Sequence, residues 1–396
     1  MSRPVPSASS DRPAPSLAGV WYNPTLRRVF WQALLIALVC AAGFYFWSNA
    51  ATNIGRRGLT LGFGFLDRPA NFAIGEALLP YSPRDSYGWA LVVGAGNTLF
   101  VAIIGCILTT VLGVLLGILR LSSNPFVARA VAVYVELGRN VPLLLQLFFW
   151  YSLITALAGP RQAYQPLPGV FLSNRGLRIP ALVANEALAF ALAGLAFAAV
   201  LTFALARRSR KVQAATGVRP PVLAWAVIAV LILPAAGIFL SGAPLSVSVP
   251  SLTGFNFSGG AELSPEFFAL VIGLVVYTTA FVTEIVRSGI QSVSRGQWEA
   301  ARALGLSSGR IMQLVVLPQA LRVMIPPLTS QYLNLTKNSS LAVAIGYPDL
   351  INIASTTINQ TGQALEVIFV FMTIYLAISL AISAGMNRLN AGVATR

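Results

Sequence analysis

Long apolar runs dominate this chain and restrict the folds that it can adopt. The first covers residues 29–47, and further candidates lie at about 89–119, 133–158, 181–206, 221–241, 266–286, 323–345 and 365–386. An apolar run of roughly 20 residues crosses a lipid bilayer as a helix. The runs are continuous and do not alternate, which argues against a transmembrane β-barrel. We therefore expect an all-α integral membrane protein with about eight transmembrane helices.

The composition supports the same class of protein. Hydrophobic residues make up 56% of the chain and charged residues only 10%, whereas soluble proteins carry about 25% charged residues. The net charge of +15 could indicate nucleic-acid binding, but the basic residues form short clusters between the apolar runs. That distribution is typical of positively charged inside loops, so we expect no nucleic-acid partner.

The chain contains no histidine. This excludes histidine-based catalytic triads, histidine zinc motifs and histidine-ligated haem. Cys40 and Cys106 lie in separate apolar runs and do not suggest a disulfide framework. We expect no catalytic residues and no metal site.

Loop charge predicts the orientation in the membrane. With the amino terminus inside, the inside segments hold Arg27, Arg28, the basic cluster at 207–211 and the long segment 287–322, whereas the outside loops near 242–265 and 346–364 have no Lys or Arg. Both termini are therefore expected to be cytoplasmic. We further expect a disordered cytoplasmic tail at 1–28, a first transmembrane helix at 29–48 and an outside, periplasmic loop at 49–88.

The inside segment 287–322 contains two short predicted helices within 294–318. Ser294 and Gln297 have the spacing of a capping box at a helix start. Gly305 suits the left-handed backbone that ends a helix. We expect Pro318 to stop the second helix before the next apolar run.

The surface of this loop is partly apolar with a charged rim. The apolar residues are Trp298, Ala300, Ala301, Leu304 and Leu306, and the charged ones are Glu299, Arg302 and Arg310. Such a surface fits docking of a protein partner. It fits equally well an amphipathic helix that lies on the membrane interface.

The spacing of this loop resembles that of a known family. Glu299, Ala300 and Ala301 are followed after three residues by Gly305, and after nine more by Val315, Val316, Leu317 and Pro318. The pattern resembles the EAA loop of bacterial ABC-importer permeases, with Val315 at a position where that family often has Ile. The segments 139–149, 283–290 and 337–341 resemble the polar amino-acid branch, although Asn140-Val141 departs from the common Gly-Thr there.

The resemblance covers roughly residues 89–390 and implies a type I ABC-importer permease core. An extra helix pair near 181–241, the first helix and the long first outside loop lie outside the compact form of that core. Expanded permeases of this kind resemble importers of many L-amino acids. The chain would form half of a translocation pathway in the bacterial inner membrane.

The resemblance also implies partners. A second homologous permease would complete the pathway, a dimer of cytoplasmic ABC ATPases would dock on the loop, and a periplasmic amino-acid-binding protein would deliver substrate. The docking residues would be Glu299, Ala300, Ala301, Gly305, Leu317 and Pro318. Neither lysine of the chain follows a glycine, so a Walker A motif is absent. We therefore expect no bound cofactor, because the partner would use the ATP.

Polar residues within the spans are candidates for the pathway, because burying them in lipid is costly. The candidates are Asn140, Gln146, Glu284, Lys337, Asn338 and Ser339. Asn140 and Gln146 flank Pro142 and fit either a pathway lining or bonds between helices. Lys337 could neutralise a substrate carboxylate or pair with Glu284 or Glu136. Pro326 and Pro327 are expected to kink or break its helix.

Two other functional classes remain open on the residues alone. A secondary amino-acid transporter driven by an ion gradient would share the many helices and the charges within them. A membrane enzyme is a weaker hypothesis, since without histidine only Ser–Lys chemistry at Lys337 remains.

Overall fold

The computed structural model describes residues 24–56, 62–218 and 220–394 of the chain. The helices are α2 (Pro24–Arg56), α3 (Tyr87–Leu119), α4 (Pro125–Asn140), α5 (Leu143–Thr155), α6 (Glu186–Thr216), α7 (Val222–Ser241), α8 (Pro265–Gln291), α9 (Arg295–Ala303), α10 (Ser308–Ile311), α11 (Leu317–Asn338), α12 (Leu350–Thr361) and α13 (Ala364–Ala394). Short 3-10 segments are η1 (Phe63–Asp67), η2 (Pro160–Gln162) and η4 (Ser339–Ile345), and η3 (Met312–Val316) is a π-helical turn.

Within the described residues, seven helical segments are long and apolar enough to cross a membrane. The number becomes eight when α4 and α5 are taken as one bent span. This confirms the expected helical class and span number. The tail expected at 1–28 lies outside the described residues up to residue 23, while residues 24–28 already belong to α2, which begins at a proline.

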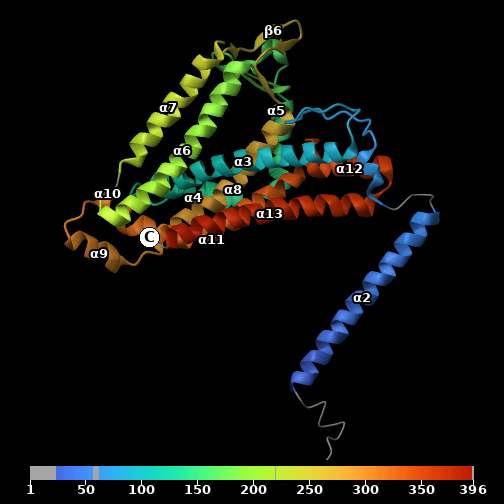
Figure 1. Cartoon of the computed structure of the whole chain (residues 1–396), viewed down its shortest axis with the longest axis horizontal. Coiled ribbons are helices and arrows are strands. Elements are labelled where there is room, and N and C mark those ends of the chain that lie inside the picture. The colour runs from blue at the N-terminus through green and yellow to red at the C-terminus, as the bar shows by residue number, and fades with distance from the viewer. Residues whose placement is uncertain (1–23, 57–61, 219, 395–396) are drawn as a thin grey trace, which may run out of the picture.

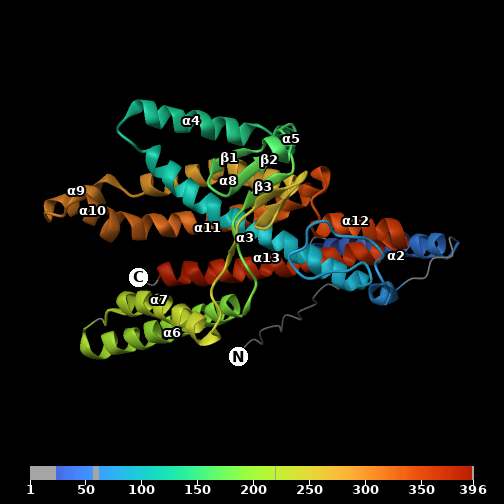
Figure 2. The same cartoon turned by 90° about the horizontal axis from the view of Figure 1, so that it is seen from above.

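Two opposite ends of the molecule can be distinguished in Figures 1 and 2. Helices α9 and α10, the turn between α6 and α7, and the carboxyl end of α13 lie at one end, and α12 lies at the other. We call these the cytoplasmic end and the outer end, after the orientation that the loop charges predict.

Small sheets at the outer side were not predicted from the sequence. The strands are β1 (Tyr164–Leu167), β2 (Val170–Ser173), β3 (Gly176–Ile179), β4 (Ala181–Leu182), β5 (Val247–Ser248), β6 (Ser251–Thr253), β7 (Asn256–Ser258) and β8 (Ala261–Leu263). They form a four-stranded sheet in the order β1-β2-β3-β8 and two hairpin-like pairs, β4-β5 and β6-β7, all antiparallel.

Glycines allow α3 and α8 to pack closely at the centre of the core. A Cβ added to Gly113 or Gly117 would stand 2.4 Å and 2.6 Å from the Cγ1 atoms of Val282 and Val286. At Gly105 it would stand 3.0 Å from Leu335. These glycines therefore serve close helix packing, since small residues let membrane helices approach each other.

The span expected at 133–158 is broken. Helices α4 and α5 meet at an angle of 105°, because Pro142 favours extended backbone at Val141 and interrupts the helical hydrogen bonds. Gln146 is buried, and its Nε2 donates to the carbonyl oxygens of Gly138 and Val141, 3.1 Å from each. Gln146 thus satisfies carbonyls that the break leaves free.

Helices α6 and α7 form a hairpin that leans away from the other helices in Figure 1. Gly194 packs on the backbone of Leu233 and Gly237 on the backbone of Phe190, where an added Cβ would stand 2.5 Å and 2.4 Å from the carbonyl oxygens. The two helices are therefore locked to each other. The hairpin joins the core through the outer strands, in which β3 pairs with β8.

Candidate functional site

The loop at the cytoplasmic end consists of α9, Gly305 and the start of a second helix. Gly305 has a φ of 73°, and a Cβ added to it would meet nothing within 4 Å. The glycine is thus required by the backbone conformation and not by lack of space. The predicted turn between two helices at Gly305 is confirmed.

Two expected details of the loop are wrong. Ser294 precedes α9 but its side chain makes no capping hydrogen bond, and the Gln297 N–H donates to the Ser294 carbonyl oxygen at 3.0 Å. The Gln297 side chain accepts from Gln319 Nε2 at 3.4 Å. Pro318 does not stop the second helix. It lies in the first turn of α11, where a missing N–H is tolerated, and the helix runs on from α10 through the wide turn η3.

The loop has an inner and an outer face. Ala301 is 3% exposed and belongs to a buried cluster with Ile311 of α10, Val316 of η3 and Met324 of α11. Trp298 and Leu306 pack against this cluster. The outer face presents Glu299, Ala300, Leu304 and Gly305. Leu304 is 80% exposed.

The remaining expected docking residues lie just behind this surface. Leu317 is 41% exposed and Pro318 is half-buried at the start of α11. Gly289 of α8 packs so closely on Met324 of α11 that an added Cβ would stand 2.3 Å from Met324 Cγ. The loop is therefore joined at both ends to helices that contact each other, and a force on it reaches α8 and α11 together.

Glu284, Arg287 and Arg120 form an ionic cluster between α8 and the end of α3. Glu284 pairs with Arg287 on the same helix and with Arg120 at the end of α3, whose Nη1 is 3.5 Å away. Glu284 and Arg287 are three residues apart and share one face of α8. The described residues show no ion pair between Glu136 and Arg139: Glu136 accepts from Asn140 Nδ2 at 3.3 Å, and the Arg139 guanidinium lies 5.3 Å from the ring centre of Phe281.

Lys337 lies on an exposed polar stripe of α11. Ser330, Asn334 and Lys337 are spaced by four and three residues and all three are exposed, so they share one helix face. None of the ion pairs found among the described residues involves Lys337. Asn338 is half-buried, and the buried Ser339 donates to the Thr336 carbonyl at 2.8 Å.

The helix that carries this stripe is continuous. Pro326 and Pro327 lie inside α11 without ending it. The helix changes to a 3-10 segment only at Ser339. Of the expected kink or break at the two prolines, the break is wrong, and Lys337 lies in the last turn of the regular helix.

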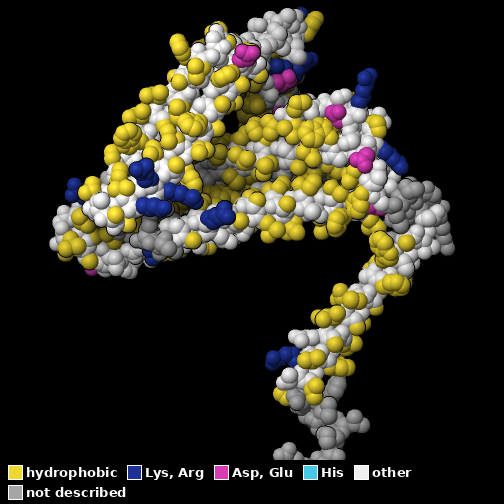
Figure 3. Space-filling view, in the orientation of Figure 1, with side chains coloured by type: hydrophobic (Ala, Val, Ile, Leu, Met, Phe, Trp, Pro, Cys, Tyr) yellow, Lys and Arg dark blue, Asp and Glu magenta, His cyan; other side chains and the backbone are white. Residues whose placement is uncertain are grey.

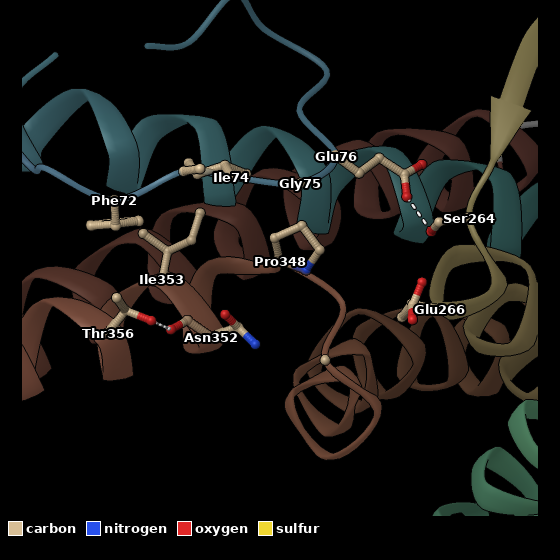
Figure 4. A pocket seen from close by; sticks show the side chains of 12 residues that line it. Phe72, Ile74, Gly75, Glu76, Ser264, Glu266, Pro348, Asn352, Ile353 and Thr356 are labelled. Carbon is tan, nitrogen blue, oxygen red and sulfur yellow. Dashed lines mark hydrogen bonds between the residues drawn. The ribbon is translucent and has the colours of Figure 1, made fainter. Parts of the chain in front are cut away.

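A pocket at the outer end was missed by the sequence reasoning (Figure 4). Its volume is about 400 Å³, and its polar lining includes Glu76, Ser264, Glu266, Asn352 and Thr356. Glu76 accepts a hydrogen bond from Ser264. Burial raises the pKa of Glu76 above its usual value, the hydrogen bond from Ser264 lowers it, and the charges of Glu266 and Glu262 add to the rise. The residues that line the pocket come from three segments far apart in the chain, so no local motif predicts it.

The chain is similar to a known family of membrane proteins over most of its length. The sequence profile of the family described as "Binding-protein-dependent transport system inner membrane component" matches residues 109–395. That range includes the exposed loop, the ionic cluster and the stripe on α11.

Three curated relatives align over nearly the whole chain. The "Putative amino-acid ABC transporter permease protein YhdX" of Escherichia coli (strain K12) is 46% identical, with 94% of this chain and 95% of the relative covered. The "General L-amino acid transport system permease protein AapQ" of Rhizobium johnstonii is 44% identical, with 96% and 95% covered. The "Glutamate/glutamine/aspartate/asparagine transport system permease protein BztB" of Rhodobacter capsulatus is 40% identical, with 94% and 95% covered.

Proposed function

Because this chain belongs to the family of binding-protein-dependent transport system inner membrane components, we propose that it is the permease subunit of an ATP-driven importer of amino acids in a bacterial inner membrane. The observation that carries the proposal is the loop at the cytoplasmic end, where an uncovered apolar and acidic surface is held in place by a buried cluster. Relatives that align end to end are named as amino-acid permeases, which supports this substrate class.

The loop docks the ATPase in this proposal. Glu299, Ala300, Leu304 and Gly305 form the outer face, and the small side chain of Ala300 leaves room for a partner to approach closely. Ala301 supports this face from within. The anchoring of the loop to α8 and α11 supports its role as the coupling element, because a movement of the docked ATPase pulls on both helices.

The sequence contains no Walker A motif. Nucleotide is therefore bound and hydrolysed by a separate ATPase dimer, and this chain holds no cofactor of its own. A second homologous permease and a periplasmic amino-acid-binding protein complete the assembly. The long outer loop and the small sheets lie on the side from which the binding protein delivers its ligand.

The stripe on α11 lines the translocation pathway. A lysine that faces lipid in mid-span is costly, and Glu284 is already paired with arginines. We assign Lys337 to the α-carboxylate of a passing amino acid, with Ser330 and Asn334 as polar neighbours. Asn140 and Asn338 are further pathway candidates, whereas Gln146, Ser339 and Glu284 serve the framework.

Reconstitution separates this function from that of an ion-gradient transporter. The tagged chain is purified in mild detergent with its bound subunits and placed in proteoliposomes with the binding protein outside and nucleotide inside. We expect an ATPase and a second permease to co-purify and radiolabelled L-amino-acid uptake to require ATP. Uptake that follows a proton or sodium gradient and ignores ATP would refute the proposal.

A further inference from the structure

A basic cavity lies at the cytoplasmic end of the α6–α7 hairpin, away from the proposed docking loop and pathway. It has a volume of about 590 Å³ and is lined by Ala204, Arg207, Arg208 and Lys211 of α6. Figure 3 shows Lys and Arg side chains gathered over this end of α6. Three cations on two successive turns repel one another unless an anion lies between them.

No acidic side chain balances these cations within the hairpin. Glu186 is the only acid between residues 186 and 241, and it opens α6 at the outer end. None of the ion pairs found among the described residues involves the three cations. The Arg207 guanidinium lies 4.3 Å from the ring centre of Phe203, which holds it against the helix.

A second, apolar cavity adjoins the basic one. Its volume is about 250 Å³. It is lined by Leu205, Arg208, Ser209, Val212, Pro220, Val222 and Trp225. Arg208 lines both cavities, so a ligand with a charged head and an apolar body can occupy them together.

The start of α7 lines the same cavity as the shared Arg208 and adds a positive partial charge there. The helix has 20 residues and begins after Pro221, with no side-chain cap on its first amides. The positive end of its dipole therefore points toward the site. Trp225 is 57% exposed one turn into α7, as expected for an aromatic side chain at the membrane interface.

We propose that these two cavities bind an anionic phospholipid of the cytoplasmic leaflet. Its phosphate lies among Arg207, Arg208 and Lys211, and its glycerol and first acyl carbons lie in the apolar cavity against Trp225. The basic cluster could serve only to orient the chain in the membrane. That role does not explain why Arg208 lines both the basic cavity and an apolar one. Clusters of Lys and Arg at the cytoplasmic end of a membrane helix attract such headgroups, and the apolar cavity beside this cluster is lined by both α6 and α7.

Native mass spectrometry of the assembled transporter tests this proposal. The complex is released from nanodiscs that contain equal amounts of phosphatidylglycerol and phosphatidylcholine, and the retained lipids are counted. Each basic side chain near a lipid surface contributes about 1 kcal/mol, so we expect about five-fold weaker phosphatidylglycerol retention for Arg208→Gln. The triple variant Arg207→Gln, Arg208→Gln, Lys211→Gln is expected to weaken it about a hundredfold.

Arg129→Gln is the matched control, because Arg129 is an exposed cation at the cytoplasmic start of α4 and lines neither cavity. Retention that survives the triple variant, or that falls equally in the control, would overturn the proposal. Displacement of the lipid by free glycerol phosphate at millimolar concentration would also overturn it, since a headgroup alone would then suffice. The readout needs no transport, so it fails or succeeds independently of the proposed function.

Discussion

Gly113 of α3 lies so close to Val282 of α8 that a Cβ on the glycine would stand 2.4 Å from Val282 Cγ1 and 2.7 Å from its Cβ. Valine is stiff at χ1 and cannot swing away. We expect Gly113→Ala to destabilise the protein by about 1–3 kcal/mol through overpacking. Thermal unfolding in detergent measures this change.

Gly385 provides the control for that experiment. It lies inside α13, and a Cβ added to it would meet nothing within 4 Å. Gly385→Ala is expected to leave stability unchanged or slightly raised, because alanine favours helices. If the clash with Val282 causes the destabilisation, adding Val282→Ala to Gly113→Ala should restore part of the lost stability. A double variant whose loss of stability equals the sum of the two single losses would contradict this interpretation.

Gly305→Ala is expected to weaken ATPase docking. The alanine must adopt a φ of 73°, which costs an L-residue about 1–2 kcal/mol, although its side chain has open space. If the loop changes its backbone conformation to relax this strain, the docking surface formed by Glu299, Ala300, Leu304 and Gly305 moves. We expect about tenfold less ATPase to co-purify, with the permease itself still folded.

Gly309→Ala is the matched variant within the same loop, since Gly309 has free space and no left-handed backbone. It should retain the ATPase at the normal level, and Gly305→Asn should lie between the two because asparagine tolerates this conformation better. Equal ATPase recovery from Gly305→Ala and Gly309→Ala would contradict the proposal that docking depends on the left-handed backbone at Gly305.

Lys337→Gln is expected to lower amino-acid uptake by about ten- to a hundredfold, the range for losing a hydrogen bond between charged groups. ATPase co-purification should stay normal, because Lys337 is remote from the loop. Lys337→Arg keeps the charge and should preserve a substantial part of the uptake. Initial-rate measurements in proteoliposomes decide this, and undiminished uptake by the glutamine variant would exclude the assigned role.

Asp349 predicts a pH dependence of stability at the outer end. It is fully buried, its Oδ1 accepts from Asn352 N at 2.8 Å at the start of α12, and burial raises its pKa to about 7. The folded protein therefore binds a proton that the unfolded chain releases near pH 4. Stability from this group is complete at low pH and is lost as the pH rises through 7.

Asp349→Asn keeps the capping oxygen but removes the charge. One pKa unit corresponds to about 1.4 kcal/mol, so the variant should be more stable than the natural chain at pH 8, by up to a few kcal/mol. The gain should shrink toward pH 5. Thermal unfolding midpoints across this range test the effect, and a gain that does not change with pH would argue for another cause.

The spans and the hinge of the loop could be predicted because each depends on local sequence. A run of apolar residues marks α3 or α13 whatever packs against it, and Gly305 marks a left-handed turn by its own conformational freedom. The effect of prolines was harder to predict. The helix pair at Pro142 is bent by 105°, whereas Pro326 and Pro327 leave α11 continuous.

The features that escaped prediction depend on contacts between distant segments. Gln297 bonds Gln319 of the next helix in place of completing a cap on its own. The outer pocket brings Glu76 to Ser264, 188 residues further along the chain. Ala301 was expected on the docking surface from its motif, but only packing reveals that it faces Ile311 and Met324 inside the loop.

The strands that lead into and out of the α6–α7 hairpin lie side by side, with Leu177 opposite Leu263 and Ile179 opposite Ala261. The chain thus leaves the core and returns to it at one place, after crossing the bilayer twice. A short turn between β3 and β8 could replace the whole excursion without reversing the direction of any other span. The hairpin is therefore an insertion whose presence or absence leaves the direction of every core span unchanged.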